Sequence, residues 1–141
     1  VLVLRVGGIC GPGGGPVDVR ARGRARRIVK PGHVFNRIHV EDIASVLLAA
    51  ATGRGSHAVY NVTDGAPSPP QDVVAHAAAL MGVAPPPEIP FESAPLSPMG
   101  RSFYAENRRV SSRRIADDLG VALAYPSYRE GLAAILADTG T

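Results

Sequence analysis

The 141-residue sequence has little or none of several residue types that define whole classes of protein. It has no tryptophan and a single cysteine, Cys10, so a disulfide framework and a cysteine-rich zinc site are both excluded. Lys30 is the only lysine beside fourteen arginines, a bias that we attribute to codon usage. No apolar run is long enough to cross a membrane, and no basic segment leads into a signal core. These absences predict a soluble, cytoplasmic protein with no membrane partner.

Two phosphate-binding motifs are absent as well. The opening stretch, VLVLRVGGICGPGGG, reads as a strand followed by glycines, as at the start of a nucleotide-binding fold. A dinucleotide fingerprint needs glycines at positions i, i+2 and i+5, and no glycine of this stretch begins such a series. The P-loop ending in Gly-Lys-Ser/Thr does not occur either, because Lys30 lies in VKPG. The stretch is therefore a strand and a glycine loop without a standard phosphate cradle.

The remaining composition is that of one globular domain. Hydrophobic residues make up 45% of the chain and charged residues 19%, with a formal charge of +3. Because Val1 lies inside an expected strand, we expect the chain to be a fragment of a longer protein. A sheet cut there would leave unpaired edges and an uncovered face. We therefore expect the isolated chain to be poorly stable or to associate.

Periodicity and turn residues predict the elements of the first half. A fully buried strand is expected over 1–6, a loop over 7–16, a short helix over 17–25, and two strands or extended segments around Pro31-Gly32. The segment VEDIASVLLAAATGRG predicts a helix, with Ile43, Val46, Leu47 and Ala50 on one face and Gly53 past its end. HAVYNVTD alternates in character and predicts a strand.

The second half begins with a change of composition at DGAPSPP. Ser68 is the expected N-cap of a helix that ends at Gly82, with an apolar stripe of Val73, Val74, Ala77, Leu80 and Met81. VAPPPEIPFE is expected to be an extended connector that cannot lie inside a sheet. Two more helices are expected in SSRRIADDLG and PSYREGLAAILAD. This order fits the α/β class: the end of a parallel sheet followed by a small, mostly helical lobe.

Four stretches, taken in order, resemble one known family. They are LRVGGICGP, NRIHVEDIASVLLAA, VYNVTDGAPSPPQDVVAHAAALMG and the tail RRVSSRRIADDLGVALAYPSYREGL. Each is similar to a segment in the second half of the extended or atypical short-chain dehydrogenase/reductases, the NAD(P)-dependent epimerase/dehydratase group. The resemblance covers nearly the whole chain, and the order of the four stretches makes it more specific than any one of them.

The resemblance implies a fold, a cofactor and a site. Residues 1–66 would be the C-terminal portion of a Rossmann NAD(P)-binding domain and residues 67–141 a substrate-binding lobe. Gly7, Gly8 and Ile9 would line the nicotinamide of NAD or NADP, and Arg101 would reach a small-molecule substrate from the lobe. The whole protein would be an oxidoreductase or an epimerase/dehydratase that acts by hydride transfer, and a homodimer is possible.

The family's catalytic Tyr-x-x-x-Lys does not occur in this chain, so no catalytic residue is assigned and no turnover by the chain alone is expected. Tyr104 and Tyr125 are each followed four residues later by an arginine, and we interpret both as surface or packing residues. Phe35 and Gly8 replace an arginine and an asparagine of many sugar-nucleotide epimerases, which argues against a diphosphate-sugar substrate.

The other polar residues have plainer interpretations. His39, between two apolar residues at a strand-to-helix junction, is expected to be a hydrogen-bonded structural histidine. Arg37 could face a ligand or pair with Asp42, and the pairing is favoured. His33, His57 and His76 are too scattered for a metal site, and none is expected.

Two alternatives stay open. The basic run from Arg20 to Lys30 holds six cations and could contact nucleic-acid phosphates, but no base-stacking aromatics lie nearby, which argues against a nucleic-acid partner. The chain could also belong to a non-catalytic binding or regulatory relative that keeps the fold and has lost the reaction.

Overall fold

The computed structural model describes residues 1–15, 23 and 25–140, and its strands form three parallel pairs. They are β1 (Val3–Val6) with β5 (Val59–Val62), β2 (Gly8–Cys10) with β4 (Arg37–His39), and β3 (Arg27–Val29) with β6 (Glu88–Pro90). The parallel pairing agrees with the expected α/β class. The helix expected over 17–25 falls mainly on residues 16–22 and 24, which lie outside the described residues.

The first core lies where α2 (Val40–Ala51) and α5 (Arg113–Asp117) cover one face of β5. Strand β5 alternates as expected, with Tyr60 and Val62 fully buried in this core. Its other buried members are Ile38, Val46, Ala49, Ile115, Leu119 and Val121. Helix α2 confirms the predicted helix, and Gly53 follows it with a φ of +79°, a backbone conformation that suits glycine.

Helices α3 (Pro70–Leu80) and α6 (Tyr128–Gly140) pack together to form a second core. Both confirm predicted helices, but Ser68 is not the N-cap of α3, because Pro69 takes that position. Ser68 instead exchanges two backbone hydrogen bonds with Phe35, each 3.0 Å long, and so belongs to a bridge between two extended segments. No helix of the described residues is long and apolar enough to span a membrane.

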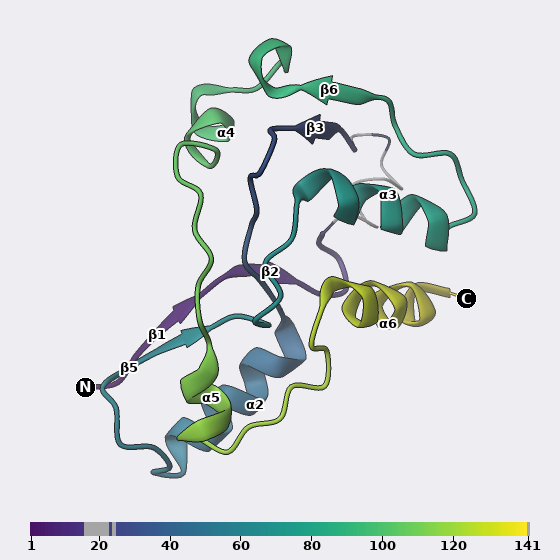
Figure 1. Cartoon of the computed structure of the whole chain (residues 1–141). Helices are drawn as coiled ribbons and strands as arrows, with labels where there is room; N and C mark the ends of the chain where they lie inside the picture. The colour runs from purple at the N-terminus through teal and green to yellow at the C-terminus, as the bar shows by residue number, and fades with distance from the viewer. Residues whose placement is uncertain (16–22, 24, 141) are drawn as a thin grey trace.

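The third core belongs to the lobe formed by β3, β6, the short turn η1 (Phe91–Ser93) and α4 (Pro98–Ser102). Figure 1 shows this lobe at one end of the molecule and the β1–β5 pair with α2 and α5 at the other. The expectation that the proline-rich connector stays outside any sheet is wrong, because β6 pairs with β3. Pro90 is tolerated there since it closes the strand, where its missing N–H removes no interior ladder bond.

Strand β1 is not fully buried, so the expectation of a fully buried strand over 1–6 is wrong. Its side chains Val3 and Val6 are 43% and 42% exposed. Within the described residues β1 has a single partner strand, and helices cover the β1–β5 pair on one face only. An apolar run of this kind is buried only when both faces of a parallel sheet are covered.

Asp42 ties the C-terminal tail to the start of α2. Its carboxylate is 1% exposed, and its two oxygens accept hydrogen bonds from the backbone N–H groups of Ala124, at 2.8 Å, and Tyr125, at 3.0 Å. These are charge-assisted bonds in a buried setting, which makes them stronger than ordinary hydrogen bonds.

We expect Asp42→Asn to lower the free energy of unfolding by about 1.5–3 kcal/mol, because one acceptor is replaced by an N–H group that faces a donor. Urea denaturation measures this loss. The matched control is Asp117→Asn at an exposed position of α5, which should change stability by less than about 0.5 kcal/mol. Equal losses in the two variants would contradict a special role for Asp42.

Candidate functional site

The chain changes its strand partner between Gly7 and Gly8. The N–H of Gly7 donates to the carbonyl of Val62 at 3.1 Å, which extends the pairing of β1 with β5. The N–H of Gly8 donates to the carbonyl of Asn36 at 2.9 Å, which begins the pairing of β2 with β4. Parallel α/β sheets bind ligands at such points, outside the carboxyl ends of the strands, where the neighbours diverge.

The two glycines meet different surroundings at this point. A Cβ on Gly7 would lie 2.9 Å from the carbonyl oxygen of Asn36 and 3.1 Å from a methyl group of Thr63, so there is no room for one. A Cβ on Gly8 would meet the same carbonyl oxygen at 3.4 Å, an ordinary contact. Gly7 is thus needed for close backbone packing, whereas Gly8 has room for a methyl group in ordinary contact.

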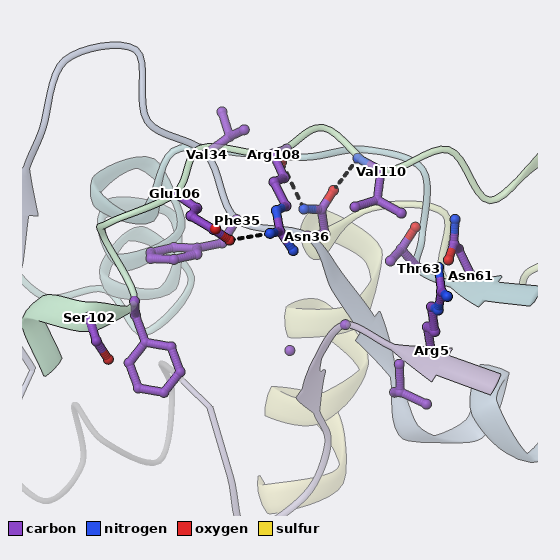
Figure 2. A pocket seen from close by; sticks show the side chains of 14 residues that line it. Arg5, Val34, Phe35, Asn36, Asn61, Thr63, Ser102, Glu106, Arg108 and Val110 are labelled. Carbon is purple, nitrogen blue, oxygen red and sulfur yellow. Dashed lines mark hydrogen bonds and ion pairs between the residues drawn. The ribbon is translucent and has the colours of Figure 1, made fainter. Parts of the chain in front are cut away.

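A cavity of about 590 Å³ opens beside both glycines. Figure 2 shows its wall, which comes from the ends of β1 and β5, the segment before β4, and the lobe segment from Ser102 to Val110. Arg5 and Asn61 are register partners on neighbouring strands, and Thr63 lies two residues further along the same face. The structure therefore gathers several hydrogen-bonding side chains here that the sequence did not single out.

Two of these polar groups lack a partner among the described residues. Thr63 is 3% exposed, and its hydroxyl oxygen has no hydrogen-bond partner. Arg5 is exposed and forms no ion pair with another described residue, whereas Arg108, on the opposite wall, pairs with Glu106. A buried hydroxyl without a partner is costly, and such groups are common where a ligand or an ordered water completes the bonding.

Asn36 holds the lobe segment against the strand ends. Its amide nitrogen donates to the carbonyl of Arg108 at 2.8 Å, and its amide oxygen accepts from the N–H of Val110 at 2.9 Å (Figure 2). Asn107 repeats this arrangement further along, accepting from the N–H of Val34 and donating to the carbonyl of Gly32. The two asparagines thus join the segment before β4 to the lobe segment on the other side of the cavity.

A second cavity, of about 570 Å³, adjoins the first at Gly8, Phe35, Asn36 and Phe103. It runs from β2 to the lobe, and its lining is mostly apolar. Ile9 and Gly8 contribute from one side, and Leu96, Phe103 and Tyr104 from the other. Of the predicted residues, Gly7 lines the first cavity, Ile9 the second and Gly8 both.

Arg37 supplies the charge in the second cavity. The favoured expectation that it pairs with Asp42 is wrong, because the carboxylate of Asp42 is engaged by the backbone of the tail. One terminal nitrogen of Arg37 donates instead to the hydroxyl of Ser68 at 2.8 Å and to its carbonyl at 3.3 Å. Burial lowers the pKa of the guanidinium, although Asp64 nearby raises it.

Asp64 follows β5 at the edge of this region. Burial raises the pKa of its carboxyl to about 6, while the N–H of Ala66 and the charge of Arg37 act in the opposite direction. Burial also raises the pKa of the Cys10 thiol, which donates to the carbonyl of Ile38 at 3.4 Å. Cys10 is therefore a protonated core group, and the thiolate is disfavoured.

Arg101 lines neither cavity. Its guanidinium donates to the carbonyls of Phe91, Glu92 and Ala94 and lies 5.0 Å from the centre of the Phe91 ring. It holds the η1 turn against α4. Of the predicted site residues, Arg101 is the one that the structure does not bring to the glycines.

The remaining candidates take structural positions. His39 is 3% exposed, accepts from the N–H of Glu41 as the cap of α2 and stacks on Tyr125, which confirms its structural interpretation. Glu41 also accepts from the hydroxyl of Tyr125 and raises its pKa, and burial raises that of Tyr104. Neither phenol is activated as a base.

No group of three or more His, Cys, Asp or Glu in the described part of the chain is arranged to hold a metal ion. The described cations of the basic run contact the lobe: Arg26 donates to the carbonyl of Pro95, Arg27 pairs with Glu88 and Lys30 donates to the carbonyl of Tyr104. The rest of that run lies outside the described residues.

Comparison with known proteins gives relatives over almost the whole chain, although no family model matches. A 3-diazoavenalumate denitrifying reductase from a Streptomyces species is 30% identical over 93% of this chain and 45% of its own length. A conserved protein of unknown function from Silicibacter pomeroyi is 55% identical, with a TM-score of 0.90 over 99% of this chain and 48% of its own. A human epimerase family protein solved with NADPH is 21% identical, with a TM-score of 0.80 over 97% of this chain and 48% of its own.

The chain has the fold of the NAD(P)-dependent epimerase/dehydratases, the extended short-chain dehydrogenase/reductases. This confirms, at the level of the fold, the family resemblance found in the sequence motifs. The chain spans about half the length of the relatives it matches.

Gly7 and Gly8 should differ in how much an added methyl group destabilises the fold. Gly7→Ala should lower the free energy of unfolding by about 1–3 kcal/mol, because its methyl group overlaps backbone that cannot move away. Gly8→Ala is the matched control and should change stability by less than about 0.5 kcal/mol. Chemical denaturation of both variants decides the matter, and a neutral Gly7→Ala would overturn the packing role.

The second prediction concerns the carboxyl of Asp64. Its carbon-13 NMR signal should titrate with a midpoint near pH 6. Because the folded state holds this proton more tightly than the unfolded state, stability should fall as the pH rises from about 4 to 6. Arg37→Gln should move the midpoint higher, since the guanidinium favours the ionised form. An unchanged or lower midpoint in that variant would contradict the proximity of the two charges.

Proposed function

We propose that this chain is the C-terminal part of an NAD(P)-dependent oxidoreductase or epimerase/dehydratase, and that it forms the nicotinamide-end loop and the wall of the substrate pocket. The observation that carries the proposal is the change of strand partner between Gly7 and Gly8, which opens onto two adjoining cavities. Solved structures of this fold are complexes with NADPH or with NAD, and one relative is named as a reductase.

The proposal assigns the phosphate loop and the Tyr-x-x-x-Lys group to a part of the protein outside residues 1–141. Neither motif occurs in this sequence, and the matched relatives are about twice as long. The exposed side chains of Val3 and Val6 support this arrangement, because they would be covered by the rest of a parallel sheet and its helices.

The two proposed parts, residues 1–66 and 67–141, are interleaved. Strand β3 comes from the first part and pairs with β6 of the second, while α5 of the second part packs on β5 of the first. A substrate pocket between a Rossmann portion and a lobe joined in this way would keep its walls at a fixed distance.

The residues present fit the nicotinamide end of such a cofactor. Gly8 lines both cavities and carries no side chain, so a flat ring could approach the backbone there. The unpartnered hydroxyl of Thr63 could serve a carboxamide group or a ribose. The bound cofactor would supply or accept the hydride, while Gly7, Gly8 and Ile9 would hold its ring beside the substrate pocket.

The test uses the longest natural protein that contains residues 1–141, titrated with NADPH and NADH by fluorescence. Gly8→Val should weaken dinucleotide binding by about tenfold or more, because its side chain enters the space proposed for the ring. Ala51→Val, at the exposed end of α2, is the control and should bind as the wild type does.

Two outcomes would overturn the proposal. If the folded wild-type protein binds neither dinucleotide, the chain belongs to a non-catalytic relative. If Gly8→Val binds as tightly as the wild type while remaining folded, the ring lies elsewhere.

A further inference from the structure

The second cavity combines an apolar wall with one charged group. Its large apolar side chains are Ile9, Phe35, Leu96, Phe103 and Tyr104. Arg37 is the only charged residue among the described residues that line it. A cavity of this composition favours a ligand with an apolar body and a single anionic group.

Among the described residues, several N–H donors of the Arg37 guanidinium have no partner. One terminal nitrogen binds Ser68, and no carboxylate of the described residues lies within ion-pair distance of the group. Asp64 is close enough to influence its charge, yet the Asp64 carboxylate accepts from the N–H of Ala66. A guanidinium carries five N–H donors, and its planar fork matches the two oxygens of a carboxylate.

Two large apolar side chains of the wall are exposed without a described partner surface. Phe103 is 64% exposed and Ile9 61%, on opposite sides of the cavity. Behind them, Phe35 and Tyr104 meet edge to face, with ring centres 5.2 Å apart. Arg37 also lies 5.9 Å from the centre of the Phe35 ring, so the cation stands at the aromatic end of the wall.

We propose that this cavity binds a small aromatic carboxylate, with the carboxylate on the free N–H groups of Arg37 and the ring between Ile9 and Phe103. The assignment rests on the proposed function and deepens it, since such a ligand would be the substrate of the proposed oxidoreductase or epimerase/dehydratase and would lie beside Gly8 and the proposed nicotinamide. Arg37 is then the residue that selects the substrate by charge, and Phe103 selects it by shape.

The probe is cinnamate, whose binding to the longest natural protein containing residues 1–141 is measured by calorimetry with and without NADPH. Arg37→Gln should weaken cinnamate binding by about 10- to 100-fold, the worth of a charge-assisted hydrogen-bonded pair. Arg37→Lys should recover part of this loss. Arg54→Gln, at an exposed arginine in the loop after α2, is the matched control and should leave binding unchanged.

Neutral and non-aromatic probes test the two halves of the assignment. Cinnamamide should bind weakly and equally to the wild type and Arg37→Gln, and acetate should bind weakly to both. Phe103→Ala should weaken cinnamate binding about tenfold without unfolding the protein, because the side chain is exposed.

The assignment is overturned if Arg37→Gln binds cinnamate as tightly as the wild type, if cinnamamide binds as well as cinnamate, or if phenyl phosphate binds more tightly than either. The NADPH titration separates this failure from that of the proposed function. Dinucleotide binding without cinnamate binding rejects the substrate class alone, and the reverse rejects the cofactor.

Discussion

Asn36 joins three segments that are distant in the sequence, and the site depends on that junction. Its backbone carbonyl receives the N–H of Gly8, and its side chain binds the backbone on both sides of Arg109 in the lobe. One residue therefore sets where β2 begins and how far the lobe stands from the strand ends. The two cavities share Asn36 because they lie on either side of this junction.

The same junction explains why neighbouring glycines differ. Gly7 packs against the carbonyl of Asn36 and against Thr63, so its missing Cβ serves the fold. Gly8 lies one residue further, where the chain has already left β5, and its missing Cβ leaves space in both cavities. A chain that changes its partner strand separates from the first strand before it pairs with the second. The space for a ligand lies between those two strands.

Local pattern predicted most elements, because α2, α3, α5 and α6 and the strand β5 each carry periodicity or end signals in their own residues. The pairing of β6 with β3 depends on contacts between distant segments. Local pattern could not reveal it, so the proline-rich stretch that contains β6 was predicted to be a connector. Ser68 had the right residue type for a cap, but its backbone is held by Phe35. For the site, motif resemblance found Gly8, whereas Asn36, Thr63 and Phe103 were missed because only the tertiary fold brings them together.

Arg37 and Asp64 are two partly buried charged groups of opposite sign that do not form a close ion pair. A close ion pair would hold the pKa of Asp64 below its usual range, yet burial raises it to about 6 despite the nearby guanidinium. The guanidinium is directed to Ser68 and the aromatic wall, so each of the two charged groups offsets only part of the desolvation cost of the other. An anion bound at Arg37 would supply the missing charge, and its negative charge would also hold the proton of Asp64 more firmly. Substrate binding and the ionisation of Asp64 are then linked through a single arginine.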